Sequence, residues 1–129
     1  MATLPILWTF RRCPYAMRAR LAIMAARTPV ALREILLKDK PEPFLTASPK
    51  GTVPVVQDGA RVIEESRDVM LWALRQNDPE GWLDMPPEGH ALIDTCDGPF
   101  KQALDHTKYA VRFPDRDEAA ERAKAMVFL

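Results

Sequence analysis

A change from strand-like to helix-like patterning near the N-terminus is the feature that most constrains the fold. Leu4–Phe10 is an apolar run that predicts a buried strand. Pro14–Arg27 then places apolar residues at helical spacing, and Pro14 stands at a helix start, where its missing N–H is harmless. The positions of this helix expected to face inward are Met17, Leu21, Met24 and Ala25. A strand leading directly into a helix is typical of α/β domains.

The following fifty residues extend this pattern into a complete domain. Three further strands are predicted, at Val30–Leu37, Thr52–Gln57 and Arg61–Ile63, the last two joined by a hairpin turn at Asp58-Gly59. A short helix is expected at Glu42–Ala47, and another runs from Ser66, as its N-terminal cap, to about Asn77. The order β-α-β, loop, β-β-α predicts a mixed four-stranded sheet with helices on its faces.

The second part of the chain has a different character. Asp78–Gly89 is rich in proline, glycine and acidic residues, which is typical of a linker. His90–Arg112 and Asp117–Leu129 are helical in pattern, and Gly98-Pro99 should kink or restart the first of these helices. We therefore expect a domain at 1–78, a linker at 79–89 and an incomplete all-α segment at 90–129.

The two C-terminal helices carry apolar stripes that two helices cannot bury alone. The stripes consist of Leu92, Cys96, Phe100, Leu104 and Val111, then Ala119, Ala123, Met126 and Val127. Three outcomes stay open: the helices dock on the first domain, they pair between chains, or they belong to a longer protein. Exposed apolar patches usually mark an interface, which favours a homodimer.

Cys13 is the residue that points to chemistry. It stands between the first strand and the first helix, where free N–H groups and the helix dipole stabilise negative charge. Such a position keeps part of a thiol as the reactive thiolate. Arg11 and Arg12 add positive charge on the same side. The sequence therefore predicts an activated sulfur at Cys13, against the alternative of an inert, half-buried cysteine.

Composition excludes several classes of protein. The 129 residues contain 18 basic and 18 acidic side chains, without the basic excess of a nucleic-acid-binding protein. No apolar run approaches the roughly 18 residues of a membrane span, and we expect no secretory signal. Cys13 and Cys96 are far apart and form no disulfide framework, which favours a reducing cytosol. Together with His90 and His106 they give no metal-ligand spacing, so no metal is expected.

Three separated segments resemble the glutathione transferase superfamily. They are Cys13-Pro14-Tyr15-Ala16, the run Ser48–Val56, and Ile63-Glu64-Glu65-Ser66 at the start of a helix. Residues 3–77 are similar to its thioredoxin-like glutathione-binding domain, and the cysteine resembles that of the omega-like and glutaredoxin-like branches. Residues 90–129 resemble the beginning of the superfamily's helical second domain.

This resemblance implies a set of ligand-binding residues. It implies a cis peptide bond before Pro54 and backbone contacts from Val53 to glutathione. Glu65 and Ser66 would hold the γ-glutamyl group. Lys50 is the candidate for the glycine carboxylate, although Thr52 occupies the position directly before Val53 where the family often has a basic residue.

Three further side chains near the start of the first helix are candidates for a supporting role at Cys13. Arg11, Arg12 and Tyr15 are candidates for tuning the thiolate, with solvation of the arginines and packing of the tyrosine as the plainer alternatives.

The chemistry implied is thiol–disulfide exchange with glutathione as co-substrate. Ala16 stands where a dithiol motif has its second cysteine, so Cys13 would form a mixed disulfide that an external thiol resolves. We expect a cytoplasmic enzyme acting on a small disulfide or electrophile, of the thioltransferase or dehydroascorbate reductase type. The alternative is a non-catalytic binding or regulatory module, or an inactive fragment of a full-length transferase.

Overall fold

The computed structural model describes residues 3–129 and divides into two compact units. The first unit ends at Leu83 and the second runs from Asp84 to Leu129. Helix α4 begins at Pro87, inside the segment expected to be linker, because a proline at the first helical position loses no hydrogen bond. Each unit is described separately below.

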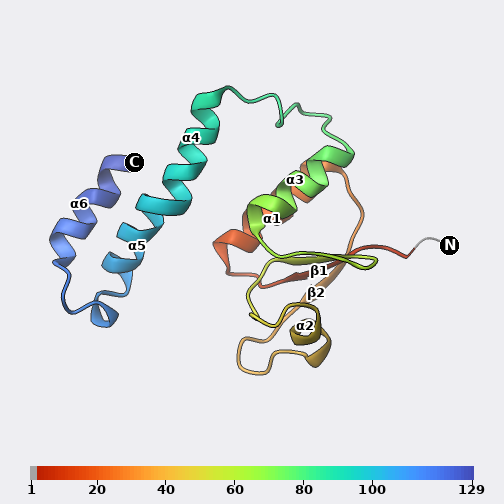
Figure 1. Ribbon diagram of the computed structural model, residues 1–129, viewed down its shortest axis with the longest axis horizontal. Coiled ribbons are helices and arrows are strands. Elements are labelled where there is room, and N and C mark those ends of the chain that lie inside the picture. Colours follow the sequence, from red (N-terminus) through yellow and green to blue (C-terminus); the bar gives the residue numbers. More distant parts are fainter. Residues whose placement is uncertain (1–2) are drawn as a thin grey trace. The chain divides into compact units, whose positions relative to one another are not determined.

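The first unit contains a mixed four-stranded sheet, as predicted (Figure 1). Its strands lie in the order β2-β1-β3-β4, with β1 parallel to β2 and antiparallel to β3, and with β3 antiparallel to β4. The strand bounds are β1 (Ile6–Thr9), β2 (Ala31–Glu34), β3 (Val55–Asp58) and β4 (Arg61–Ile63). This is the thioredoxin-like arrangement of a β-α-β unit followed by a hairpin and a helix.

Strand β1 lies inside the sheet and serves two cores, one on each face. Successive side chains of a strand point to opposite faces. Leu7 lies opposite Val56 in register, and both belong to the core beneath α1 and α3. Trp8 lies opposite Val55, and both pack with Phe44 of α2 (Glu42–Ala47) on the other face. Helix α2 has the bounds that the sequence predicted.

Strand β2 is shorter than the predicted Val30–Leu37. Only Ala31–Glu34 pairs with β1, and β2 is the edge strand of the sheet. Leu32 within the strand is exposed, whereas Ile35 beyond the strand end is buried. An edge strand has one neighbour, so its side chains find less cover than those of β1.

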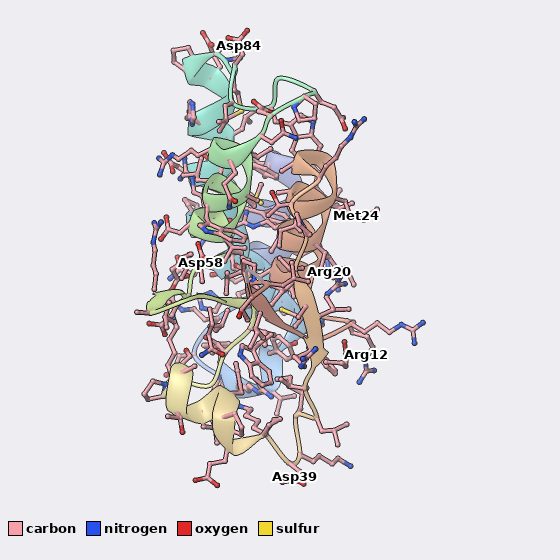
Figure 2. The ribbon with its side chains drawn as sticks, turned by 90° about the vertical axis from the view of Figure 1, so that its right-hand side faces the viewer. Arg12, Arg20, Met24, Asp39, Asp58 and Asp84 are labelled. Atoms are coloured by element: carbon pink, nitrogen blue, oxygen red, sulfur yellow. The ribbon has the colours of Figure 1, made fainter. Side chains whose placement is uncertain are left out.

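Helix α1 (Pro14–Ala26) packs on α3 (Ser66–Gln76) through a face different from the one predicted (Figure 1). The buried face consists of Ala16, Ala19, Ala22, Ile23 and Ala26, with Ala25 also buried. The expectation for Met17, Leu21 and Met24 was wrong, since all three are exposed, and Met24 projects from α1 with 74% of its surface accessible (Figure 2). Alanine faces allow two helices to approach closely, which larger side chains would prevent.

The second unit consists of helices in sequence. They are α4 (Pro87–Thr95), a π-helical turn (Cys96–Phe100), α5 (Lys101–Lys108), a short 3₁₀ helix (Ala110–Arg112) and α6 (Glu118–Phe128). The π-helical turn falls at Gly98-Pro99, where a kink or restart was predicted. The Asp117 side chain accepts a hydrogen bond from the Ala119 N–H and so caps α6.

The interior of the second unit is partly polar. His106 Nδ1 on α5 lies 3.4 Å from Glu121 Oε2 on α6, and both side chains are buried. The Lys124 ammonium, hydrogen-bonded to Glu121, lowers the pKa of this carboxyl, and His106 acts in the same direction. The expected apolar stripes are largely exposed within this unit: Leu92, Ala119, Ala123, Met126 and Val127 are all exposed, as is 95% of the surface of Val111.

Two adjacent residues of α1 test the orientation of this helix. Ala22→Leu should lower the free energy of unfolding of the first unit by about 1–3 kcal/mol, because the added methylenes have no space against α3. Leu21→Ala, one residue away on the exposed face, should change it by less than about 0.5 kcal/mol. Fluorescence during urea unfolding measures both, since all three tryptophans lie in the first unit. Equal effects of the two variants would contradict this orientation.

Candidate functional site

Cys13 occupies the predicted junction between strand and helix. It is the N-terminal cap residue of α1, with extended backbone angles, and its side chain is half-buried. Pro14 stands at the first helical position and contributes no N–H, and the Met17 N–H donates to the Cys13 carbonyl. The thiol thus stands at the positive end of the helix dipole.

Arg20 holds the loop that leads to Cys13. Its Nη1 donates to Thr9 Oγ1 at 2.6 Å and to the Phe10 carbonyl at 3.2 Å, and its Nη2 donates to the Arg11 carbonyl at 3.0 Å. Figure 2 labels Arg20 on α1 and Arg12 in the loop between β1 and α1. Because one guanidinium from α1 binds three consecutive residues, the loop has a defined path from β1 to Cys13.

The loop before β3 faces the thiol. The Val53–Pro54 peptide bond is cis, as predicted, and Pro54 is fully buried. Cys13 Sγ lies 3.8 Å from the Val53 carbonyl oxygen, within the range of a weak S–H donor. The sulfur and the backbone of Val53, expected to contact one ligand, therefore lie side by side.

The start of α3 brings together the remaining predicted residues. Lys50 pairs with the Glu65 carboxylate, and this hydrogen bond raises the pKa of Lys50. Buried Ser48 donates to Glu64 at 2.7 Å and ties the same two segments together. Ser66 is the first residue of α3, and the cap position belongs to Glu65, so the expectation that Ser66 caps the helix was wrong.

Ser66 is instead engaged by a residue that the sequence analysis did not single out. Arg18 of α1 donates from Nε to Ser66 Oγ at 3.0 Å. The signal for Arg18 and Arg20 was present, because both are charged residues on a helix otherwise made mainly of alanine and larger apolar side chains. A charged side chain that is partly buried needs a hydrogen-bonding partner to offset its lost hydration.

Three predicted tuning residues have other contacts. Arg11 is exposed, and its backbone N–H donates to Glu34 at 2.8 Å. The Arg12 guanidinium lies over the Phe10 ring, and that of Arg18 lies over the Tyr15 ring at 5.2 Å from its centre. Tyr15 thus lies against Arg18, and both Arg11 and Arg12 are exposed.

A cavity of about 440 Å³ adjoins part of this cluster. Lys50, Glu64, Glu65 and Asp68 line it, together with Arg61 and Arg75. Cys13 and Val53 do not contribute to it. A larger cavity of about 510 Å³ lies wholly in the second unit, between α5 and α6. The half-buried thiol lines neither of these two cavities.

A cysteine at a helix start beside a cis-proline loop defines the class of thioredoxin-like thiol proteins. Comparison with known proteins refines this class. The profile described as "Glutathione S-transferase, N-terminal domain" matches residues 7–82. The chain belongs to the glutathione S-transferase superfamily, as a member of cysteine type.

Several known proteins are similar to this chain in sequence. The chain is 37% identical over 111 residues to "Glutathione S-transferase DHAR2" of Arabidopsis thaliana. The aligned residues make up 86% of this chain and 48% of that protein. It is 31% identical over 100 residues to "Probable glutathione S-transferase DHAR1, cytosolic" of Oryza sativa subsp. japonica. That alignment covers 75% of this chain and 47% of the relative. The chain thus spans about half the length of these two relatives.

Solved structures share the fold. Glutathione transferase Omega 3C from Trametes versicolor is 17% identical, with a TM-score of 0.81 over 99% of this chain and 57% of that protein. Glutathione S-transferase unclassified 2 from Bombyx mori is also 17% identical, with a TM-score of 0.78 over 98% of this chain and 63% of the other. At such identity the likeness concerns the fold alone.

Within residues 3–129, no helix is long and apolar enough to cross a membrane. No group of three or more histidine, cysteine, aspartate or glutamate side chains in that range could hold a metal ion.

The two cysteines should differ in reactivity toward iodoacetamide. Cys13 should be alkylated at least about tenfold faster than Cys96 at neutral pH, because the helix start stabilises its thiolate. Peptide mass spectrometry after timed quenching measures both rates in one sample. In urea the rates should become equal, since the helix start is lost, and equal rates in the folded protein would contradict the assignment.

Proposed function

We propose that this protein binds glutathione along Val53 and the start of α3 and performs thiol–disulfide exchange through Cys13. The observation that carries the proposal is the closed set of contacts among three segments far apart in sequence. Cys13 contacts Val53, Lys50 contacts Glu65, and the helix that begins at Cys13 contacts Ser66. A ligand that touches all three would span the sulfur, a backbone pairing surface and a pair of opposite charges.

In the first step, the Cys13 thiolate attacks the glutathione sulfur of a mixed disulfide between glutathione and a substrate. A bond forms between the two sulfurs, the old disulfide breaks, and the substrate leaves as a thiolate that takes a proton from water. The positive end of the α1 dipole, where Cys13 is the N-cap residue, stabilises the Cys13 anion before the attack.

In the second step, the thiolate of another glutathione attacks the glutathione sulfur bound to Cys13. Oxidised glutathione leaves and the Cys13 thiolate is restored. In sum, one mixed disulfide and one glutathione give one substrate thiol and one oxidised glutathione. Ala16 supports this route, because no second thiol at that position can resolve the intermediate internally.

We propose a first domain at residues 1–78 and a helical segment that begins with α4 at Pro87, so the linker expected at 79–89 is shortened to 79–86. A cytoplasmic location agrees with the name of one relative, described as cytosolic, although other relatives are named chloroplastic. A non-catalytic binding module is the alternative, and it would bind glutathione without turnover.

Replacing the nucleophile separates these two functions. Cys13→Ser should lower the rate of glutathione-dependent reduction of a small mixed disulfide by at least about a thousandfold, because an alcohol is not a competent nucleophile toward sulfur at neutral pH. Cys96→Ser is the matched control and should keep the full rate. A coupled assay of oxidised glutathione measures both. Full activity of Cys13→Ser would exclude the mechanism, and an inactive wild-type protein that binds glutathione would favour the binding module.

We also propose that the protein forms a homodimer. Val111, Met126, Val127 and Leu129 are exposed large apolar residues of the second unit. Covering them between two copies removes apolar surface from water. Light scattering at tens of micromolar protein should give twice the chain mass of 14.6 kDa or more. Val127→Glu should increase the monomer fraction, and a monomeric wild-type protein would contradict the proposal.

A further inference from the structure

Arg18 joins the two helices whose first turns carry Cys13 and Ser66. Its side chain leaves α1, is half-buried, and donates from Nε to Ser66 Oγ at 3.0 Å. The guanidinium also lies over the Tyr15 ring. A cation thus contacts the helix start that is expected to receive the ligand's γ-glutamyl group.

The bond between Arg18 and Ser66 has only one possible direction. A guanidinium has donors and no acceptor, so the Ser66 oxygen accepts. A hydroxyl has a single proton, and that proton must then point away from Arg18, toward another acceptor. Donation from a charged group also polarises the hydroxyl, which makes it a stronger donor in turn.

Ser66 stands where an anion is favoured. It is the first residue of α3, an eleven-residue helix, and the N–H groups of the first turn have no partner within the helix. The Ser66 hydroxyl, with its proton directed by Arg18, adds a side-chain donor at this helix end. The neighbouring Glu65 carboxylate offers an acceptor for an ammonium group.

We propose that Arg18 is a positioning residue that orients and polarises the Ser66 hydroxyl as a donor to the carboxylate of an α-amino-acid group. The inference rests on the proposed function and goes beyond it, because it assigns recognition of the γ-glutamyl end to a residue that does not touch the ligand.

A pair of probes isolates this end of the ligand. S-methylglutathione carries the γ-glutamyl group and cannot form a disulfide. S-methylcysteinylglycine is the same molecule without that group. NMR titration measures millimolar dissociation constants for both. Arg18→Met should raise the Kd of S-methylglutathione about three- to tenfold, as expected for one weakened hydrogen bond, and should leave the Kd of the dipeptide unchanged.

A double-mutant cycle shows whether Arg18 acts through Ser66. In the Ser66→Ala background, Arg18→Met should change the Kd of S-methylglutathione by less than about twofold, because the hydroxyl is already absent. Arg33→Met, on the exposed part of β2, is the matched loss of a guanidinium and should change neither Kd. The rate of Cys13 alkylation should be the same in Arg18→Met as in the wild type.

Each other result contradicts a specific statement. An equal loss of affinity for both probes, or an undiminished loss in the Ser66→Ala background, would overturn the role of Arg18 while leaving glutathione binding intact. Absence of S-methylglutathione binding to the wild type would overturn the proposed function and this inference together. If Arg18→Met fails to fold, Arg18→Leu also removes every donor at this position, and an unchanged Kd of S-methylglutathione for that variant would overturn the inference.

Discussion

The close packing of α1 on α3 is the interaction on which the rest of the first unit depends. Ala19, Ala22 and Ala26 contribute only methyl groups from α1 to the core that it shares with α3, and Arg18 of α1 reaches Ser66 of α3. The same contact covers one face of the sheet, and it sets where both helices begin. Since the candidate site is built from the first turns of these helices, its geometry is a result of alanine packing some distance away.

Much of this fold could be predicted because strand and helix periods differ strongly. The bounds of α2, the strand Arg61–Ile63 after the hairpin turn and the start of α1 at Pro14 agree with the sequence. Proline restricts the backbone locally, and glycine permits the positive φ that Gly59 adopts in the turn. The inward face of α1 could not be predicted in this way. Hydropathy favours Met17, Leu21 and Met24, but the distance between two packed helices favours alanine, and that distance is a tertiary property.

The candidate site shows a similar division. Cys13, Val53, Pro54 and Glu65 occupy motifs whose local geometry follows from a helix start, a cis proline and a hairpin. Arg18 and Arg20 lie one and two turns along α1, and their partners come from β1, the following loop and α3. No pattern of neighbouring residues indicates such partners, because they depend on how α1 packs. The contact between Ser48 and Glu64 was not predicted for the same reason.

The ion pair of Lys50 with Glu65 has a consequence for selectivity. These two residues, each expected to hold one end of a ligand, satisfy one another in its absence. A bound molecule competes with this internal partner, and only one that brings opposite charges of its own, at the right separation, can replace both halves of the pair. A neutral molecule of the same size and shape would leave Lys50 and Glu65 together and gain nothing from them. Under the proposed function, the resting pair would therefore favour ligands that carry two opposite charges over uncharged thiols.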